Sequence, residues 1–290
     1  MAVDPISFEG LPFRKMHGLG NDFVVLDGRS QHLAFTQSQL ARISDRRFGI
    51  GCDQLIVLEA STQADARMRI FNPDGGEVQA CGNATRCIGA LIADEAGRAE
   101  ARIETMAGVL FARREGHDIA VDMGLPELGW VQIPLAGAGG GTDRIPLDLS
   151  ALAPELPGWF SAVNMGNPHA VFFVANAGAI DLQQIGAAIE VHPLFPQKVN
   201  VSFAQVIDKS RITLRVWERG AGATLACGTA ACATAVAGQR LGFVGEIVRL
   251  DLPGGSLTIR RSPEGHVIMI GPTAETYSGV MTPGLFAGVA

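Results

Sequence analysis

The chain carries one cysteine motif twice, and this repeat limits the folds that it can adopt. Ala80-Cys81-Gly82 and Ala226-Cys227-Gly228 lie 146 residues apart (227 minus 81), and a stretch of small residues with a second cysteine follows each. Further matches at the same offset join 68–72 to 214–218, 18–21 to 164–167, and Gln54 to Asn200. Such self-similarity predicts two copies of one structural unit.

Hydrophobic alternation and turn residues predict the elements of one unit. The pattern favours strands at about residues 12–16, 22–27, 54–59 and 67–71, helices at about 37–46 and 82–96, and further strands to about 123. Thr36 and Gln39 are spaced as a capping box for the first helix, and Asp181 can cap its counterpart at 182–190. Gly97 and Gly242 stand where helices should end. We expect an α+β fold of two pseudo-symmetric, β-rich domains.

The length of the chain agrees with two domains, because 290 residues exceed the usual size of one hydrophobic core. A segment with several Pro and Gly residues, 125–141, separates the two copies. We expect a first domain of residues 1–125, with the tail 275–290 packed back on it, and a second domain of residues 126–274. Within the separating segment, 136–141 is expected to be a flexible loop.

Charge and composition restrict the partners. The formal charge is −6 and no run of Lys or Arg offers a basic stripe, so nucleic acid is not an expected partner. The first ten residues lack the basic and apolar regions of a secretory signal, so we expect a cytoplasmic protein with no membrane partner. Five cysteines are an odd number and are expected to be thiols in a reducing compartment. A small polar molecule is the expected substrate.

The two repeated thiols suggest proton transfer at carbon. Inversion of a stereocentre through a carbanion needs a base on one face and an acid on the other, and two copies of one motif can supply both. Cys81 and Cys227 each precede a glycine and a helix start, where the helix dipole should lower the thiol pKa from ~8.5. The same helix ends would bind a substrate carboxylate, and the developing enediolate, through backbone N–H groups of Gly82, Asn83, Gly228 and Thr229.

No cofactor is expected. The chain has only three lysines for a pyridoxal Schiff base, Lys15, Lys198 and Lys209, and none lies in a repeated polar segment. The segment 18–20 lacks the third glycine of a dinucleotide-binding fingerprint. The cysteine spacing does not fit a zinc site, so no metal is expected, whereas a redox dithiol stays open as an alternative. The other three cysteines are expected to be small buried side chains: Cys52, Cys87 and Cys232.

The repeat indicates a functional role for several polar residues. His169 lies in the loop 166–169, which the repeat places beside the thiol motif. Alone, each asparagine would be an ordinary turn or strand-end residue. The repeat relates them in pairs, which favours a binding role: Asn21 with Asn167, Gln54 with Asn200, and Asn72 with Glu218.

With these residues together, the sequence closely resembles the diaminopimelate epimerases, which are pyridoxal-independent enzymes. The resemblance runs nearly end to end and rests on motifs in the family's order: 16–23 (MHGLGNDF), 71–75 (FNPDG), 80–83 (ACGN), 165–169 (MGNPH), 218–222 (ERGAG) and 226–229 (ACGT). It implies that each domain wraps around a central helix, that the protein forms a homodimer, and that it interconverts LL- and meso-2,6-diaminopimelate for lysine and peptidoglycan precursor biosynthesis.

The resemblance also implies roles for individual residues. Cys81 and Cys227 would be the acid and base, and His169 and Glu218 would assist them. The residues implied to hold the substrate, mostly at its distal amino-acid end, are Asn21, Asn72, Asn167, Asn200 and Arg219, and Gln54 would line the site. Because Arg219 and the asparagines could grip a second carboxylate and Glu218 a second ammonium group, the substrate should carry two amino-acid ends.

Four alternatives remain open from the sequence. A proline or hydroxyproline racemase would share the fold, but its substrate has one carboxylate and does not need Arg219. A phenazine-biosynthesis-like isomerase would not require paired cysteines. A non-catalytic amino-acid-binding protein and a dithiol oxidoreductase belong to other classes, and the absence of α-proton exchange would distinguish them.

Overall fold

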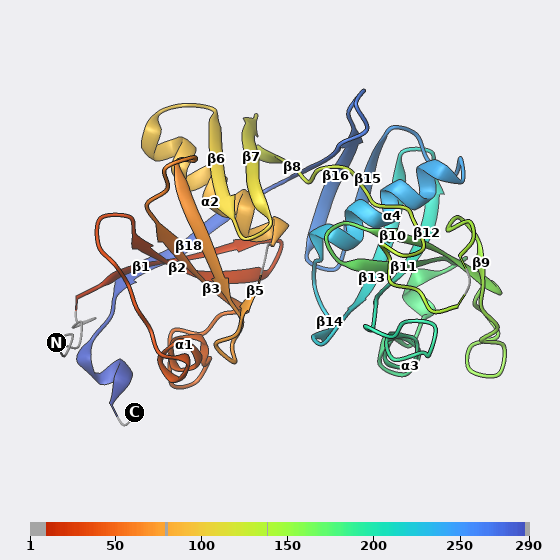
Figure 1. Ribbon diagram of the computed structural model, residues 1–290, viewed down its shortest axis with the longest axis horizontal. Coiled ribbons are helices and arrows are strands. Elements are labelled where there is room, and N and C mark those ends of the chain that lie inside the picture. Colours follow the sequence, from red (N-terminus) through yellow and green to blue (C-terminus); the bar gives the residue numbers. More distant parts are fainter. Residues whose placement is uncertain (1–9, 79–80, 138, 288–290) are drawn as a thin grey trace. The chain divides into compact units, whose positions relative to one another are not determined.

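The structure, a computed structural model, describes residues 10–78, 81–137 and 139–287 (Figure 1). Its contacts divide the chain into two compact units, unit 1 (Met1–Val121 and Pro272–Ala290) and unit 2 (Asp122–Gly271). These units correspond in outline to the predicted ranges 1–125 with 275–290, and 126–274. That each unit acts as a functional domain stays a prediction.

Unit 1 is a mixed sheet wrapped around one helix. The strands of this sheet are β1 (Pro12–Gly18), β2 (Asn21–Gly28), β3 (Gln54–Glu59), β4 (Ala66–Phe71), β5 (Glu77–Val78), β6 (Glu100–Thr105), β7 (Gly108–Glu115), β8 (Asp118–Asp122) and β18 (Ala274–Val280). Strand β18 pairs with β1, and the sheet continues through β2, β3 and β4 to β6, β7 and β8. The pairs β2–β3 and β4–β6 are parallel and the others antiparallel. The predicted strands are confirmed, within two residues at their ends.

Helix α2 (Gly82–Ala96) is the central helix of unit 1, as predicted. Every residue from Gly82 to Ala93 is buried, and the helix packs against β6, β7 and β1. At Gly89 an added Cβ would lie 2.4 Å from the Cβ of Ala112, so only glycine allows helix and strand to approach this closely. Gly97 ends the helix in the left-handed conformation with φ 62°, which confirms the predicted C-cap.

Helix α1 (Gln37–Ser44) closes the other side of unit 1. Thr36 accepts a hydrogen bond from the backbone of Gln39, whose side chain accepts one from the backbone of Thr36, so the predicted capping box is confirmed. Leu40 and Ile43 of this helix join the hydrophobic core formed by β2 and β3. The helix ends at Ser44 and not at 46, because the chain then turns back to Gly49.

Unit 2 repeats the topology of unit 1. Its strands are β9 (Ile145–Pro146), β10 (Trp159–Asn164), β11 (Pro168–Phe173), β12 (Asn200–Asp208), β13 (Arg211–Glu218), β14 (Gly222–Ala223), β15 (Ile247–Leu252), β16 (Gly255–Arg261) and β17 (Val267–Gly271). Strands β11 and β12 pair in parallel, as do β13 and β15, in the places of β2–β3 and β4–β6. Helix α4 (Gly228–Arg240) occupies the place of α2 and is almost wholly buried. The repeat predicted from the cysteine motifs is therefore confirmed.

The predicted helix at 182–190 is only partly correct. Asp181 caps its start, since the carboxylate accepts from Gln184 N at 3.1 Å. The helix begins, however, as a π-helical turn, η2 (Leu182–Gly186), and only α3 (Ala187–Glu190) is α-helical. The Trp217 side chain lies against Gly186, 2.7 Å from where a Cβ would stand, so the widened turn is packed against β13. The remaining short helices are η1 (Ala177–Ala179) and η3 (Pro283–Phe286).

The segment 125–141 between the copies is packed onto unit 2 just before the predicted loop 136–141. Ile133 and Leu135 are buried in the core of unit 2, and the N–H of Ala136 donates to the carbonyl of Leu194 at 2.9 Å. Residue 138, in the predicted loop 136–141, lies outside the described residues. The Pro and Gly residues indicated a break in regular structure. They did not indicate that Ile133 and Leu135 would pack into the core of unit 2.

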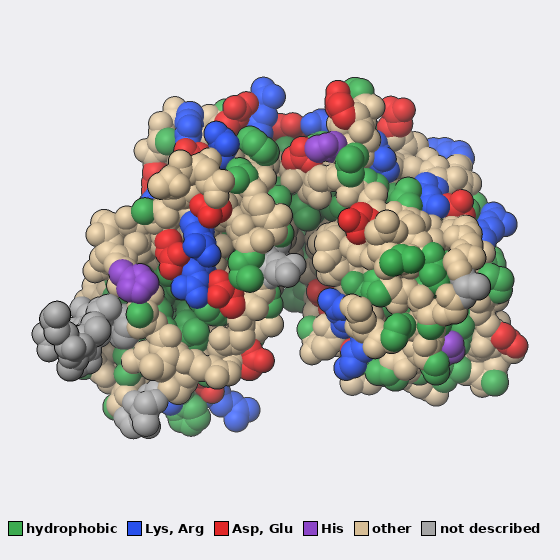
Figure 2. All heavy atoms as spheres, in the orientation of Figure 1, with side chains coloured by type: hydrophobic (Ala, Val, Ile, Leu, Met, Phe, Trp, Pro, Cys, Tyr) green, Lys and Arg blue, Asp and Glu red, His purple; other side chains and the backbone are tan. Residues whose placement is uncertain are grey.

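The surface carries charges of both signs. Lys and Arg side chains are interspersed with Asp and Glu over the face seen in Figure 2. Arg69, for example, binds Glu77 at 2.8 Å and Glu59 at 3.2 Å. None of the helices in the described ranges has the length and the apolar run that a membrane span requires.

Candidate active site

The two repeated thiols occupy the same position in the two units. Cys81 is the N-cap of α2, with φ −145° and ψ 114°, and Cys227 is the N-cap of α4, with φ −127° and ψ 112°. Neither side chain caps its helix. Each thiol therefore stands beside a helix start, where backbone N–H groups without intrahelical partners can receive an anion.

In unit 1 the thiol lies beside Asn21, which follows the tight turn between β1 and β2. Leu19 (φ 58°) and Gly20 (φ 85°) form that turn in left-handed conformations. The Oδ1 atom of Asn21 accepts from the Sγ of Cys81 at 3.7 Å and from the Nδ2 of Asn83 at 3.2 Å. The structure thus gathers three of the predicted site residues around one amide oxygen.

Two further predicted residues of unit 1 bind each other. The Nε2 of Gln54, at the start of β3, donates to the Oδ1 of Asn72 at 3.2 Å. The backbone of Asn72 is held in a turn, since its N–H donates to Gly76 and its carbonyl accepts from Gly75. The Oε1 of Gln54 is buried without a hydrogen-bond partner among the described residues, which leaves it an acceptor for a ligand. We name Asn21, Gln54, Asn72, Cys81 and Asn83 the first half-site.

In unit 2 the thiol has a charged neighbour. Burial raises the pKa of Cys227 well above its usual range, and the negative charge of the nearby Glu218 carboxylate raises it further. A contact with the Thr229 hydroxyl at 3.5 Å and the N–H of Ala230 oppose this shift without cancelling it. The expected lowering of this pKa is therefore wrong for Cys227, because burial and the Glu218 charge outweigh the hydrogen bonds at the helix start.

His169 is fully buried on β11. Its Nε2 lies 2.8 Å from the Oδ1 of Asn167, so that nitrogen carries the proton and Nδ1 is left as an acceptor. Nδ1 is buried and has no hydrogen-bond partner in the described part of the chain. Burial, together with the charge of Arg219, lowers the pKa of His169 to about 3, so the imidazole is neutral at physiological pH.

Asn200 fastens two loops of unit 2 to each other. Its Nδ2 donates to the carbonyl of Pro168 at 3.0 Å, and its Oδ1 accepts from the N–H of Arg219 at 3.0 Å. The side chain is buried, and both ends of the amide bind backbone. Arg219 is exposed, and its Nη1 donates to the carbonyl of Gln197 at 3.1 Å. We name Asn167, His169, Asn200, Glu218, Arg219, Cys227, Gly228 and Thr229 the second half-site.

Comparison with known proteins decides the family. The family model described as diaminopimelate epimerase matches residues 13–129 and 161–275. A curated diaminopimelate epimerase of Rhodospirillum centenum is 49% identical over 279 residues, which cover 95% of this chain and 94% of its own length.

This chain belongs to the diaminopimelate epimerase family.

Solved structures agree with this family on the fold. A phenazine biosynthesis protein of the PhzF family from Bacillus anthracis aligns with a TM-score of 0.68 and 16% identity over 94% of this chain and 99% of that one. A hydroxyproline epimerase from Agrobacterium vitis aligns with a TM-score of 0.62 and 16% identity over 94% and 91%. The predicted α+β fold is confirmed. As a member of a family of epimerases, the chain is an isomerase, so the binding-protein and oxidoreductase alternatives lose their support.

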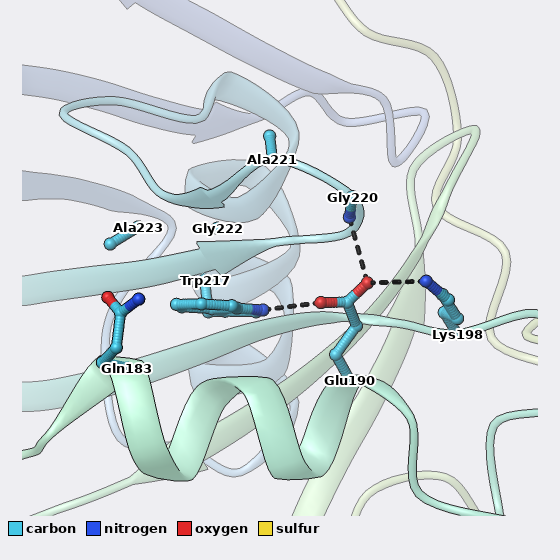
Figure 3. Close-up of a pocket in the computed structure, with 8 residues that line it drawn as sticks. All are labelled: Gln183, Glu190, Lys198, Trp217, Gly220, Ala221, Gly222 and Ala223. Atoms are coloured by element: carbon cyan, nitrogen blue, oxygen red, sulfur yellow. Dashed lines mark hydrogen bonds and ion pairs between the residues drawn. The ribbon is translucent and has the colours of Figure 1, made fainter.

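The sequence analysis did not identify Glu190. Its side chain holds the β13–β14 turn, next to Glu218 and Arg219. Its carboxylate accepts from Trp217 Nε1 at 2.7 Å and from the N–H of Gly220 at 3.0 Å, and lies 3.5 Å from Lys198 Nζ (Figure 3). Gly220 follows Glu218 and Arg219 directly. Burial alone would raise the pKa of Glu190, but the hydrogen bonds from Trp217 and Gly220 lower it. Glu190 thus anchors the β13–β14 turn.

Two other residues next to the half-sites were also missed. The hydroxyl of Thr224 donates to Glu218 Oε1 at 2.5 Å, and Asp53 accepts from the side chain of Asn21 at 3.1 Å. The repeat could not reveal them, because the residues at the same offset are Val78 and Val199, which have no polar side chain.

Proposed function

We propose that this chain interconverts LL-2,6-diaminopimelate and meso-2,6-diaminopimelate without a cofactor, in the biosynthesis of lysine and peptidoglycan precursors. Membership of the family supports the reaction, and 49% identity to a curated diaminopimelate epimerase over nearly the whole chain supports the substrate. The observation that carries the mechanism is the equivalent placement of Cys81 and Cys227, each at the N-cap of a central buried helix.

The proposed reaction is a proton exchange at one carbon. The thiolate of one cysteine takes the α-proton and becomes a thiol, while the bonding electron pair stays on the substrate as an enediolate. The thiol of the other cysteine then donates its proton to the opposite face of the carbon and becomes a thiolate. No electron leaves the substrate, and the total number of protons is unchanged. The two thiols have exchanged protonation states, so the enzyme must exchange protons with solvent before it repeats the same direction.

The helix starts are proposed to hold the reacting carboxylate. Backbone N–H groups of Gly82, Asn83, Gly228 and Thr229 belong to the first turns of α2 and α4, whose dipoles favour an anion. The same N–H groups would stabilise the enediolate more than the substrate carboxylate, because the enediolate carries more negative charge. This difference lowers the barrier to proton removal.

The distal amino-acid end is proposed to lie against the polar residues that differ between the copies. Arg219 would pair with the second carboxylate and Glu218 with the second ammonium group, with Asn72 and Asn167 as further partners. Asn200 would act through Arg219, since its amide is already bound to the backbone of that residue. Gln54 would contribute its unpartnered Oε1.

The resting protonation states follow from the surroundings of the second half-site. Because burial and Glu218 raise the pKa of Cys227, this thiol carries its proton in the free enzyme. In the direction of turnover that starts from this state, we therefore assign Cys227 as the donor of the new proton and Cys81, as its thiolate, as the base that takes the α-proton. Neutral His169 would assist as a hydrogen-bond partner, not as a cationic acid.

The test is to incubate the protein with LL-diaminopimelate in deuterated water without pyridoxal phosphate, and to follow stereochemistry and α-deuterium. Interconversion with one deuterium gained at the inverted carbon is expected. Cys81→Ala and Cys227→Ala should each abolish it, whereas Cys232→Ala, on the same helix as Cys227 but in the core, should keep it. Interconversion of proline or hydroxyproline in place of diaminopimelate would contradict the proposed substrate.

We also propose a cytoplasmic homodimer. In the described part of unit 1, β18 pairs only with β1, so its other edge is open, and Tyr277 and Val280 on it are exposed. Open edges with apolar side chains favour pairing with another chain. Sedimentation of the purified protein as a monomer at micromolar concentration would contradict the dimer.

A further inference from the structure

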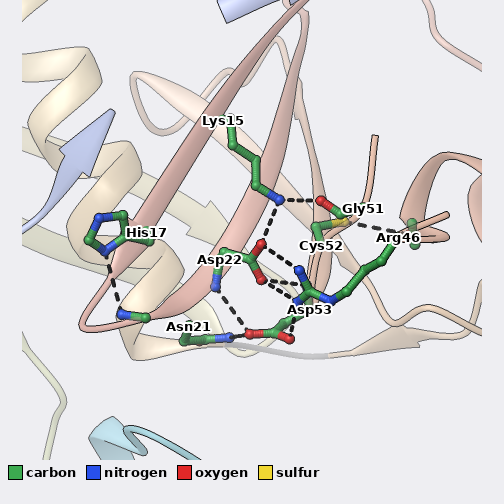
Figure 4. A network of polar contacts seen from close by, with 10 residues as sticks. Lys15, His17, Asn21, Asp22, Arg46, Gly51, Cys52 and Asp53 are labelled. Atoms are coloured by element: carbon green, nitrogen blue, oxygen red, sulfur yellow. Dashed lines mark hydrogen bonds and ion pairs between the residues drawn. The ribbon is translucent and has the colours of Figure 1, made fainter. Parts of the chain in front are cut away.

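Asp53 lies where its carboxylate can control the amide of Asn21. Strands β2 and β3 pair in parallel with Phe23 opposite Gln54, so the preceding Asp53 lies beside Asn21 and Asp22 (Figure 4). The Oδ2 of Asp53 accepts from the Nδ2 of Asn21 at 3.1 Å and from the N–H of Asp22 at 3.1 Å.

The Asp53 carboxylate is itself held by a charged network. Its Oδ1 accepts from Arg46 Nη2 at 2.7 Å, and the same guanidinium binds both oxygens of Asp22 at 2.7 and 3.0 Å. Lys15 pairs with Asp22 at 2.5 Å. Burial would raise the pKa of Asp22, but hydrogen bonds from Arg46 and Lys15 outweigh it and lower the pKa. The network therefore fixes Asp53 as an acceptor facing Asn21.

This contact allows only one orientation of the Asn21 amide. With Nδ2 on Asp53, Oδ1 faces Asn83 Nδ2 at 3.2 Å and Cys81 Sγ at 3.7 Å. A flipped amide would set its oxygen against the Asp53 carboxylate and its NH₂ against the NH₂ of Asn83. Both new contacts would pair like with like, so the flip loses hydrogen bonds at both ends.

We propose that Asp53 is a positioning residue that holds the Asn21 amide with its oxygen toward the Cys81 thiol. An amide oxygen can accept from the S–H group but cannot donate to a thiolate, so this orientation favours the protonated form of Cys81. Asp53 therefore sets how strong a base Cys81 is. Its importance for catalysis rests on the proposed function, whereas the orientation can be tested without turnover.

The contact between Asp53 and the Asn21 amide has no counterpart among the described residues of the second half-site. The repeat places Val199 at the position of Asp53, and the Oδ1 of Asn167, the counterpart of Asn21, contacts Nε2 of His169 at 2.8 Å. A role in folding common to both copies would not explain a carboxylate present in only one of them.

The first experiment measures the labelling of Cys81 by iodoacetamide as a function of pH, read by peptide mass spectrometry, in the parent and in Asp53→Asn. The variant has the same shape, and its amide oxygen should stay on the cationic Arg46 guanidinium at the Oδ1 position. Its NH₂ then faces Asn21, which releases the Asn21 amide to turn its own NH₂ toward Cys81. We expect labelling at neutral pH to be about three- to tenfold faster, with the pH profile displaced downwards, and labelling of Cys227 unchanged. Equal Cys81 profiles in the two proteins would overturn the proposal.

Loss of a negative charge could by itself speed the labelling. The charged groups around the network are Lys15, Asp22 and Arg46, with buried Arg86 on α2. A double-mutant cycle separates the two effects: in Asn21→Ala, the further change Asp53→Asn should leave the Cys81 profile unchanged, because the amide is gone. The same acceleration in that background would show a direct charge effect and contradict the positioning role.

A second measurement serves if Asp53→Asn does not fold. In the parent, the side-chain amide protons of Asn21, assigned by their loss in Asn21→Ala, should exchange slowly with solvent because one is bound to Asp53. Rapid exchange of both would overturn the proposal. If labelling responds as expected but diaminopimelate is not epimerised, the proposed function fails and the orientation stands.

Discussion

At the scale of single residues, the two thiols share a backbone position but not a chemical environment. Cys81 donates to the neutral amide of Asn21, whereas Cys227 lies near the negative charge of the Glu218 carboxylate. The residue that the repeat places opposite Glu218 is Asn72, a neutral amide. Burial and the negative charge of Glu218 together raise the pKa of Cys227 well above its usual range.

The effect of Glu218 on Cys227 can be measured by Glu218→Gln. Because the negative charge raises the pKa of the thiol, its removal should lower that pKa and increase the thiolate fraction at a given pH. The measurement is a titration of thiolate ultraviolet absorbance, with Cys227→Ala subtracted as the reference. Glu264→Gln, an exposed carboxylate of the same unit, is the control, and an unchanged titration in Glu218→Gln would contradict the assigned contact.

His169 should make the fold sensitive to acid. Its pKa is about 3 in the folded chain and 6.5 in the reference state, so between these values the unfolded chain binds more protons. The stability that neutral His169 contributes is therefore lost as pH falls from 6.5 towards 3, by roughly 2–4 kcal/mol. Urea unfolding across this range should show a shallower loss in His169→Asn than in the parent. Parallel curves would show that His169 is not buried in its neutral form.

At the scale of elements, the central helices set the positions of the thiols. Helix α2 approaches β7 so closely at Gly89 that there is no room for a Cβ. Gly89→Ala should therefore destabilise the protein by about 1–3 kcal/mol through overpacking against Ala112. Thermal or urea unfolding measures this loss.

The controls for Gly89→Ala differ in how much room the added methyl group has. Gly158→Ala adds the same methyl group where nothing lies within 4 Å, and should change stability little. Adding Ala112→Gly to Gly89→Ala removes the atom that the new methyl group meets and should recover part of the loss. If this pair is no more stable than the single variant, overpacking is not the cause.

The β13–β14 turn depends in the same way on Glu190. Glu190→Ala leaves the Trp217 Nε1 and Gly220 N–H donors without their partner, so we expect a loss of about 2–4 kcal/mol and a weaker kcat/KM, because the turn carries Glu218 and Arg219. Lys198→Met removes only a half-exposed ion pair and should cost under about 1 kcal/mol. Comparable losses in the two variants would mean that the ion pair, not the turn, is the role of Glu190.

Much of this element pattern was predictable because it depends on local sequence. The capping box at Thr36, the C-cap at Gly97 and the span of α2 follow from side chains that act within a few residues. The π-helical turn at Leu182–Gly186 did not follow, because it is packed against Trp217, far along the chain. Asp53 and Glu190 were missed for the same reason, and the pKa of Cys227 was misjudged because burial is a property of the folded chain.

At the scale of the whole molecule, duplication gives the protein two equivalent thiols and divergence gives it two different surroundings for them. Strands β10 to β17 repeat β1 to β8, with the same two parallel pairs. What the copies share, a cysteine before a buried helix, is what the proposed exchange at one carbon would need on each side. What they do not share, Glu218 and Arg219, is what a second amino-acid end of the substrate would bind.

The early distribution of deuterium between substrate and product distinguishes two thiols on opposite faces of one carbon from a single base. LL-diaminopimelate is incubated with the enzyme in deuterated water and stopped at a few per cent conversion. If the two cysteines act as separate donor and acceptor, the meso product carries deuterium at the inverted carbon and the recovered LL substrate carries almost none. Equal early labelling of product and substrate, or a product that keeps the original proton, would mean that a single base serves both faces and would contradict the account.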